Sequence, residues 1–111
     1  SGKIPPLTKA FEIACFRIVQ EFLNNSMKHG KATQVELRFD LDKKNELLKV
    51  KLSDNGKGFD INAANGKLGM GLRNIKTRVE SYYGSFKIES KENKGTTILM
   101  NFPLTFIILQ P

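Results

Sequence analysis

The sequence predicts an α+β fold, a two-layer sandwich with helices packed on one face of a mixed, mainly antiparallel sheet. Three observations lead to this expectation. Two segments carry apolar residues at helical spacing, four shorter segments carry them at alternate positions, and they follow one another as helix, two strands, loop, helix and two strands. Each helix and each strand pair therefore has one apolar side that it can bury against the other layer.

The first predicted helix begins at Thr8, which can cap it, and runs to about Gly30, since glycine suits a helix end. At helical spacing, the apolar residues form the expected core face: Cys15, Phe16, Ile18, Val19, Phe22, Leu23 and Met27. The residues expected on the opposite, polar face are Arg17, Gln20, Glu21, Asn24, Asn25 and Lys28. We expect the two faces not to mix.

The remaining elements follow from shorter patterns. Residues 35–41 alternate apolar and polar side chains, and so do residues 48–52 after a polar turn, which predicts a hairpin with one face buried. A second helix is expected over residues 70–83, which carry apolar residues at helical spacing and precede a glycine. Two more strands, residues 85–90 and 96–102, are expected on either side of another polar turn.

Length and composition indicate a single soluble domain. A chain of 111 residues can bury one core, and its hydrophobic fraction of 40% and charged fraction of 26% are ordinary. No apolar run approaches the roughly 20 residues that a membrane span needs. The single cysteine, Cys15, cannot form an internal disulfide and lies on an apolar helix face, which favours a reduced, cytosolic setting and a buried thiol.

The net charge of +7, from 18 basic and 11 acidic residues, raises the question of nucleic-acid binding. The basic residues are spread from Lys3 to Lys94, and no motif combines basic and aromatic side chains. We therefore expect no nucleic-acid partner. A polyphosphate ligand needs only a few local cations, which this chain offers.

The polar face of the first helix carries a second signal. Glu21, Asn25 and Lys28 are spaced by four and three residues, so a carboxylate, an amide oxygen and an ammonium group project along one stripe. Asparagine inside a helix is unfavourable by very roughly half a kcal/mol relative to alanine. Oxygen ligands of this kind suit Mg²⁺. The alternative is an ordinary solvated face with a stripe of charges.

Glycines cluster between the second strand and the second helix. Five of the nine glycines lie between Gly56 and Gly71, after Asp54, and a helix follows them. Backbone without Cβ atoms can approach a ligand closely, and a helix N-terminus favours anions, so the segment indicates a nucleotide site. Asn55-Gly56 alone is a hairpin-turn signal, but no clear alternating strand follows Gly58, which weakens that interpretation. The segment matches neither a phosphate-binding loop nor a dinucleotide-binding fingerprint.

The ordered combination of four motifs resembles a known superfamily. Residues 17–29 resemble its N box, residues 54–59 its D-x-G-x-G box, residues 69–74 its G-x-G-L box and residues 95–97 its last box. This superfamily joins DNA gyrase, heat-shock chaperones, mismatch-repair proteins and sensor histidine kinases, and its fold is the Bergerat-type ATP-binding fold.

Within the superfamily, the chain looks most like the ATP-binding catalytic domain of bacterial histidine kinases, particularly the nitrate-sensor-like class. This closer resemblance rests on two features: Gln20-Glu21 precedes Asn25, and the segment between Gly58 and Gly69 is short. The resemblance covers about residues 9 to 104, which we expect to form the domain. Residues 1–8 would then be a lead-in that opens on a cloning remnant, and residues 105–111 a tail with no assigned function.

The resemblance implies that ATP and Mg²⁺ bind here. It implies that Asn25 coordinates Mg²⁺, and that Glu21 acts as general base and reaches the same metal through water. Lys28 would neutralise phosphate charge. His29, the one histidine, would lie near the nucleotide rather than accept the phosphoryl group.

The same resemblance assigns the adenine site. Asp54 would accept a hydrogen bond from the adenine amine, Gly56 and Gly58 would let the base enter, and Thr96 would support that contact, often through water. Gly69 and Gly71 would let a lid close and offer backbone N–H groups to phosphate. The remaining residues implied to bind ATP are Lys67, Leu72 and Arg73.

The activity implied is transfer of the γ-phosphoryl group of Mg-ATP to a histidine on a separate dimerisation domain, with a response regulator downstream. Because the acceptor histidine is missing, this chain is not expected to autophosphorylate alone. We expect a cytoplasmic location without membrane contact by this domain, and leave open whether the parent protein is anchored in the inner membrane. The alternatives are a serine kinase that inhibits a sigma factor and an inactive nucleotide-binding interaction module.

Overall fold

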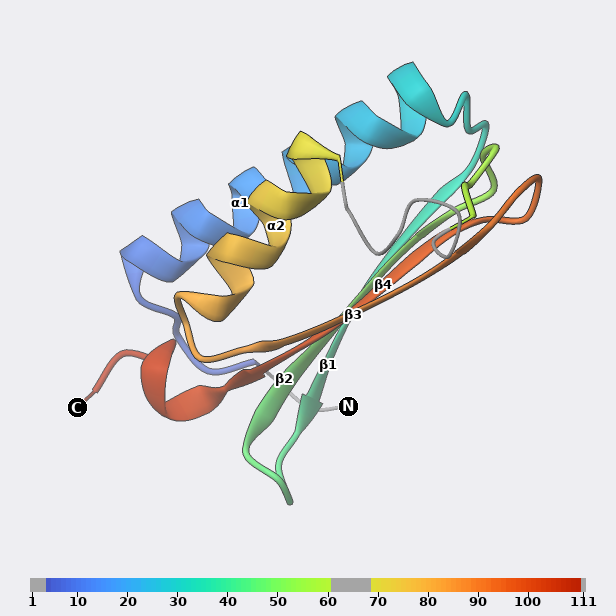
Figure 1. Cartoon of the computed structure of the whole chain (residues 1–111). Coiled ribbons are helices and arrows are strands. Elements are labelled where there is room, and N and C mark those ends of the chain that lie inside the picture. Colours follow the sequence, from blue (N-terminus) through green and yellow to red (C-terminus); the bar gives the residue numbers. More distant parts are fainter. Residues whose placement is uncertain (1–3, 61–68, 111) are drawn as a thin grey trace.

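The computed structural model describes residues 4–60 and 69–110. In this part of the chain two helices lie on one face of a four-stranded sheet (Figure 1), as predicted. None of the helices described is long and apolar enough to cross a membrane. In chain order the elements are α1 (Lys9–Asn24), η1 (Asn25–His29), β1 (Val35–Asp42), β2 (Leu47–Asp54), α2 (Met70–Glu80), β3 (Ser85–Lys91), β4 (Gly95–Pro103) and η2 (Leu104–Phe106).

The sheet has the strand order β1-β2-β4-β3, and every neighbouring pair is antiparallel. The expected mixed character is therefore not seen among the strands that the structure describes. β2 and β4 are the central strands, and their register places Asp54 directly opposite Thr96. This pairing brings the last residues of β2 and the first residues of β4 to the same end of the sheet, and α1 also ends there (Figure 1).

The core lies between the helix layer and the two central strands. Phe11 of α1 packs edge to face against Phe102 of β4, with ring centroids 4.9 Å apart, and against Tyr82, at 5.3 Å. The fully or nearly fully buried residues of this cluster are Phe11, Ile18, Phe22, Leu48, Val50, Leu52, Leu72, Ile75, Val79, Ile98, Met100, Phe102 and Ile107.

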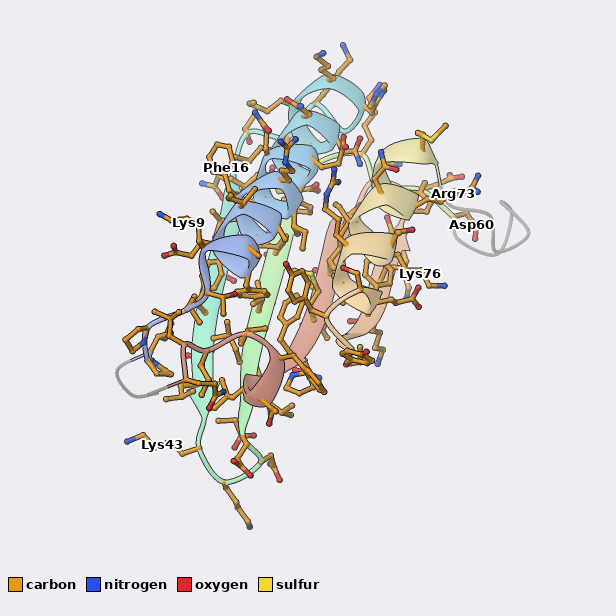
Figure 2. The ribbon with its side chains drawn as sticks, turned by 90° about the vertical axis from the view of Figure 1, so that its left-hand side faces the viewer. Lys9, Phe16, Lys43, Asp60, Arg73 and Lys76 are labelled. Carbon is orange, nitrogen blue, oxygen red and sulfur yellow. The ribbon has the colours of Figure 1, made fainter. Side chains whose placement is uncertain are left out.

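The buried face of α1 is narrower than predicted. Phe16 and Met27, both expected in the core, are 66% and 61% exposed, and Phe16 projects outward from α1 in Figure 2. The fully buried positions, Phe11, Ile18, Phe22 and Ser26, follow at spacings of seven, four and four residues. A stripe that follows these spacings turns Phe16 and Met27 away from the sheet.

The separation of core and polar faces was also wrong. Asn25 lies next to Ser26 on the inward side of the helix and is half-buried, and so is Glu21 one turn earlier. Lys28, by contrast, is exposed. The predicted stripe of three polar groups is therefore split between a half-buried part and a solvent-facing part.

The first hairpin buries less than predicted. Along β1, Leu41 is buried, but Val35, Leu37 and Phe39 are 41%, 41% and 37% exposed. β1 is an edge strand, and the core cluster draws its sheet residues from β2 and β4. The apolar side of β1 therefore lies at the margin of the helix layer.

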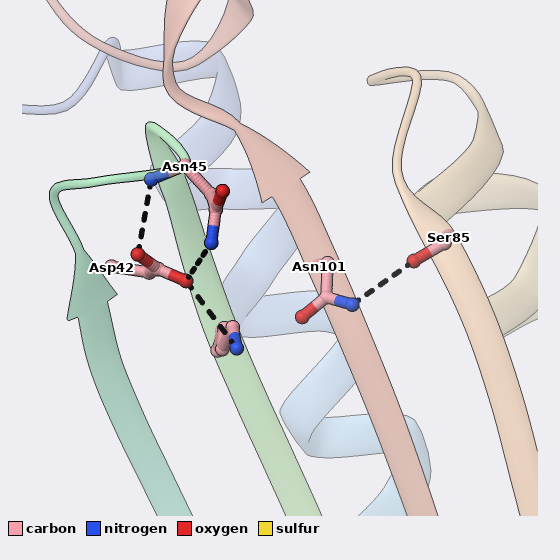
Figure 3. Close-up of polar contacts among 5 residues, drawn as sticks. Asp42, Asn45, Ser85 and Asn101 are labelled. Carbon is pink, nitrogen blue, oxygen red and sulfur yellow. Dashed lines mark hydrogen bonds and ion pairs between the residues drawn. The ribbon is translucent and has the colours of Figure 1, made fainter.

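Two groups of polar contacts lie at the end of the sheet that carries the β1–β2 turn (Figure 3). In the β1–β2 turn, the backbone N–H of Asn45 donates to Asp42 Oδ1 at 3.1 Å, its side-chain amide donates to Oδ2 at 2.9 Å, and Lys49 Nζ lies 3.4 Å from Oδ2. The Asn45 hydrogen bonds are the main reason that the pKa of Asp42 lies below its usual value, with Lys49 adding to them. Across β3 and β4, Asn101 Nδ2 donates to Ser85 Oγ at 3.3 Å.

The tail packs back on the domain. Ile107 is fully buried, and its carbonyl accepts a hydrogen bond from the Thr8 N–H at 2.8 Å. The Leu109 N–H donates to the Pro6 carbonyl at 2.9 Å, and Leu7 pairs with Ile108. Thr8 also caps α1 as predicted, because its Oγ1 accepts from the Phe11 N–H at 3.1 Å. The lead-in and the tail thus hold each other beside the start of α1.

Candidate functional site

A cavity of about 560 Å³ opens where α1 and η1 end, α2 begins and the central strands meet. It is lined by Phe22, Asn25, His29, Gly30, Asp54, Gly58, Phe59, Gly69, Met70, Gly71, Leu72 and Thr96. Most of the predicted site residues are therefore brought together. Those outside the lining are Glu21, Lys28, Gly56 and Arg73, and Lys67 lies outside the residues that the structure describes.

The helix widens as it reaches the cavity. Asn25–His29 form one π-helical turn, in which the Gly30 N–H donates to the Asn25 carbonyl at 2.9 Å. Such widened turns are rare in proteins, and those that occur often lie at functional sites. Here the turn ends the helix at the cavity wall and leaves Asn25 half-buried there, with His29 more exposed. The apolar periodicity gave no sign of it.

Asp54 is held by three donors. Its Oδ1 accepts from the Gly56 N–H at 2.9 Å and from the Thr96 N–H at 3.1 Å, and its Oδ2 accepts from Ser26 Oγ at 2.6 Å. An ionised carboxylate has about four acceptor positions, two on each oxygen. These bonds occupy both positions on Oδ1 and one on Oδ2. The carboxylate is thus fixed in orientation, and among the residues that the structure describes Oδ2 keeps one acceptor position, on a residue that lines the cavity.

Ser26 was missed by the sequence reasoning. It is 1% exposed, and its hydroxyl makes the shortest of the three bonds to Asp54. The available signal was a polar residue four positions after Phe22, on a helix stripe that is otherwise apolar. A buried hydroxyl needs a partner, and through this hydrogen bond Ser26 also joins η1 to the end of β2.

Residues 55–59, which follow β2 and are called the glycine loop below, are shaped by backbone contacts. Gly58 has a φ of +60°, and a Cβ there would collide with the carbonyl oxygen of Lys91. Both facts require glycine at this position. Gly56 does not line the cavity; it lies against the backbone of Gly30, whose carbonyl accepts from the Lys57 N–H at 2.7 Å. Gly56 therefore packs the loop against the end of the helix, rather than forming the cavity wall.

A second loop closes against the first. The Phe59 N–H donates to Ser90 Oγ at 2.9 Å, and the same hydroxyl lies 2.9 Å from Thr96 Oγ1 and 3.1 Å from the Gly95 carbonyl. The Asn93 N–H donates to the Lys57 carbonyl at 2.5 Å. The β3–β4 turn is thus joined to the glycine loop. Ser90, the centre of this arrangement, was not predicted.

The N-terminus of α2 faces the cavity. Gly69 caps the helix without a side-chain hydrogen bond, and Gly69, Met70, Gly71 and Leu72 all line the cavity. The first N–H groups of a helix have no partner within the helix, so they are suited to an anion. Arg73 is exposed on the outer side of α2 (Figure 2), away from this lining.

Gly71 approaches the side chain of Asn25 closely. A Cβ at Gly71 would lie 2.8 Å from Asn25 Nδ2 and 2.9 Å from its Oδ1. Glycine at this position therefore leaves space for the amide of Asn25 between the two helices. The amide group is placed where the cavity, the end of α1 and the start of α2 meet.

The fold and the cavity define the class of this protein: a two-layer α+β domain with a glycine-lined cavity, whose wall carries a fixed carboxylate. The chain belongs to the family of histidine kinase-, DNA gyrase B- and HSP90-like ATPases, which matches residues 11–106. The resemblance inferred from the four motifs is thereby confirmed at the level of the family. Assignment to the nitrate-sensor-like class stays a prediction.

Relatives are named sensor kinases. The chain is 37% identical over 101 residues to the signal transduction histidine-protein kinase/phosphatase DegS of Bacillus subtilis, covering 89% of this chain and 26% of DegS. It is also 37% identical over 98 residues to the sensor histidine kinase LiaS of the same organism, covering 88% of this chain and 26% of LiaS. The chain thus spans about a quarter of the length of these relatives.

Two solved structures agree with the fold. The ATP-binding domain of PrrB from Mycobacterium tuberculosis superposes with a TM-score of 0.68 at 20% identity, over 82% of this chain and 67% of that one. The histidine kinase domain of the blue-light activated kinase of Erythrobacter litoralis gives 0.67 at 22% identity, over 83% and 44%. Both likenesses confirm the two-layer arrangement.

Proposed function

We propose that this chain is the ATP-binding catalytic domain of a two-component sensor histidine kinase. In this proposal the domain binds Mg-ATP in the cavity and transfers the γ-phosphoryl group to a histidine on a separate dimerisation domain. Membership of the ATPase family and the names of the relatives support it. The boundaries of the domain, residues 9–104, are part of the proposal.

The observation that carries the proposal is the hydrogen bonding of the Asp54 carboxylate. Its three partners within residues 4–60 and 69–110 are all donors, so the carboxylate acts as an acceptor, and these contacts leave one position on Oδ2 for a ligand. The amine of adenine is a donor of the required kind. A charged acceptor forms a stronger hydrogen bond than a neutral one, and the rigid mounting means that little order is lost when the base binds.

The residues near Asn25 fit a magnesium ion. The side chain of Asn25 is half-buried at the cavity wall, its amide oxygen is a hard ligand, and Gly71 leaves space for it. Within residues 4–60 and 69–110 no group of three acidic, histidine or cysteine side chains gathers to hold a metal. That is the pattern expected when Mg²⁺ takes most of its shell from phosphate and water. When bound, the ion neutralises charge on the phosphates.

Glu21 and Lys28 lie at the edge of this region. Glu21 is half-buried one turn before Asn25, where its carboxylate can accept the proton of the attacking histidine or bind a metal-bound water. Lys28 is exposed, as suits a flexible cation that meets phosphate charge only when ligand is present. His29 lines the cavity and is assigned to the nucleotide.

The phosphates are assigned to the N-terminus of α2. Gly69 and Gly71 expose backbone N–H groups there, and Leu72 completes the wall. Arg73 is assigned a long-range role, because it is exposed and does not line the cavity. The assignment of Lys67 rests on its position in the sequence alone.

The partners proposed are the dimerisation domain that carries the acceptor histidine, and a response regulator. We propose a cytoplasmic location for the domain. Isothermal titration calorimetry with ATP, first with Mg²⁺ and then with excess chelator, tests binding: one site that tightens with Mg²⁺ is expected. No binding under either condition would reject the proposal.

Phosphoryl transfer needs its own experiment. The domain is mixed with a separately purified dimerisation domain of DegS and radiolabelled ATP, and label on histidine is expected. Labelling of serine instead of histidine on a supplied acceptor protein would favour the serine-kinase alternative. ATP binding without transfer to any acceptor would favour an inactive interaction module.

A further inference from the structure

The hydroxyl of Ser90 makes three hydrogen-bond contacts but has only one proton to donate. Phe59 N–H donates to its oxygen, while Thr96 Oγ1 and the Gly95 carbonyl lie within hydrogen-bond distance, at 2.9 and 3.1 Å. A serine hydroxyl has one proton and two lone pairs. The Gly95 carbonyl has no proton to give, so a bond between it and Ser90 requires the Ser90 proton.

One arrangement satisfies all three contacts. Ser90 donates its proton to the Gly95 carbonyl, and its two lone pairs accept from the Phe59 N–H and from the Thr96 hydroxyl. If Ser90 donated to Thr96 instead, its bond to the Gly95 carbonyl would be lost. The complete arrangement fixes the direction of the Thr96 hydroxyl, whose proton points to Ser90.

Thr96 lines the cavity, so the direction of its hydroxyl matters to a ligand. With its proton used by Ser90, the Thr96 hydroxyl can act toward a ligand only as an acceptor. Its backbone N–H is bonded to Asp54 Oδ1, so the two residues form one continuous wall. Asp54 and Thr96 therefore both offer acceptors on this wall.

We propose that Ser90 is a positioning residue that sets base specificity, by holding Thr96 as an acceptor beside Asp54. This inference rests on the proposed function, in which the cavity binds a purine nucleoside triphosphate. An exocyclic amine at the purine 6-position has two protons and needs two acceptors. Asp54 accepts one, and Thr96 accepts the other directly or through one water. A 6-oxo purine offers an acceptor at that position and meets two acceptors.

Loss of the Ser90 hydroxyl removes the acceptor that fixes the direction of the Thr96 hydroxyl proton. In Ser90→Ala the proton of Thr96 has no fixed partner and can turn into the cavity, where it can donate to a 6-oxo group. Discrimination between ATP and inosine triphosphate should then fall by about three- to tenfold, the contribution of one neutral hydrogen bond. A merely structural role, in which Ser90 anchors Phe59, would weaken the binding of both nucleotides equally and leave their ratio unchanged.

The test measures the dissociation constants of ATP and inosine triphosphate by calorimetry for four proteins. They are the wild type, Ser90→Ala, Ser90→Thr and the control Ser85→Ala. Ser85 is the first residue of the same strand, bonds to Asn101 (Figure 3) and does not line the cavity. We expect a reduced ATP preference in Ser90→Ala, its recovery in Ser90→Thr, and a wild-type ratio in Ser85→Ala.

The outcomes separate the two proposals. If the wild type binds neither nucleotide, the proposed function fails and this inference falls with it. If the wild type prefers ATP but Ser90→Ala keeps the same ratio, or increases it, the role of Ser90 is wrong while ATP binding stands. A reduced ratio that Ser90→Thr does not restore would also overturn the inference, because it would not depend on the hydroxyl.

Discussion

Replacing Asp54 with asparagine changes one atom of the wall that we assign to adenine. Oδ1 accepts from two N–H groups, so in the Asp54→Asn variant the amide oxygen must stay at that position to avoid placing a donor against two donors. The new NH₂ group then takes the place of Oδ2. Ser26, which donates to Oδ2, can reverse its hydroxyl and accept from the NH₂ group. The fold should therefore survive.

A ligand has no such freedom. The adenine amine would face the NH₂ group, donor against donor, and would lose a hydrogen bond to a charged acceptor. Such a bond contributes about 1.5–3 kcal/mol, which is about 10- to 150-fold in the dissociation constant. Calorimetric titration with ATP measures this change, and thermal unfolding checks that the variant is folded.

Asp40→Asn is the matched control. It removes the same charge from β1, at a position outside the cavity lining. It should bind ATP like the wild type. If Asp54→Asn is folded and also binds ATP with wild-type affinity, the assignment of Asp54 to the adenine amine is wrong.

Three further predictions test other parts of the structure. Asn25→Ala should bind ATP with little dependence on Mg²⁺, because the amide ligand is lost; a Mg²⁺ response of wild-type size in calorimetry would contradict the metal assignment. Ile107→Ala should lose about 2–5 kcal/mol of unfolding free energy in urea, since Ile107 is fully buried, whereas the exposed Leu109→Ala should change it by less than about 0.5 kcal/mol. Asp42→Asn should lower the melting temperature at neutral pH. Because the folded-state pKa of Asp42 is lowered, the contribution of its charge to stability is present above the unfolded-state pKa and is lost as pH falls through the folded-state pKa. The melting temperatures of the wild type and Asp42→Asn should therefore converge in acid. A difference in melting temperature that persists in acid would refute this explanation.

The order of the elements, and the gathering of most of the proposed site residues around one cavity, could be predicted because their signals are local. Asp54 and Thr96 each lie in a recognisable motif, and the antiparallel pairing of β2 with β4 places them opposite each other. Periodicity predicted the helices to within a few residues. What it could not predict was which part of an apolar stripe faces the sheet, so Phe16 was wrongly placed in the core.

Ser26 and Ser90 show the limit of pattern reading. Both are small polar residues, and neither disturbs the apolar periodicity enough to be singled out. Their importance comes from partners 28 and 31 residues away in the sequence, Asp54 and Phe59. Such a partner is defined by strand register and by the close approach of two loops. Those are properties of the packed molecule, which spacing along the chain does not contain.

The pairing of the lead-in with the tail has a mechanical consequence. Leu7 and Ile108 lie side by side where α1 begins, and the cavity lies where the same helix ends. The molecule is elongated, with extents of 46 × 24 × 24 Å. If this domain is attached to another through these paired segments, the attachment lies beside the start of α1 and the cavity lies at the far end of that helix. A small rotation at the attachment would sweep the cavity, and any nucleotide in it, through a much longer arc.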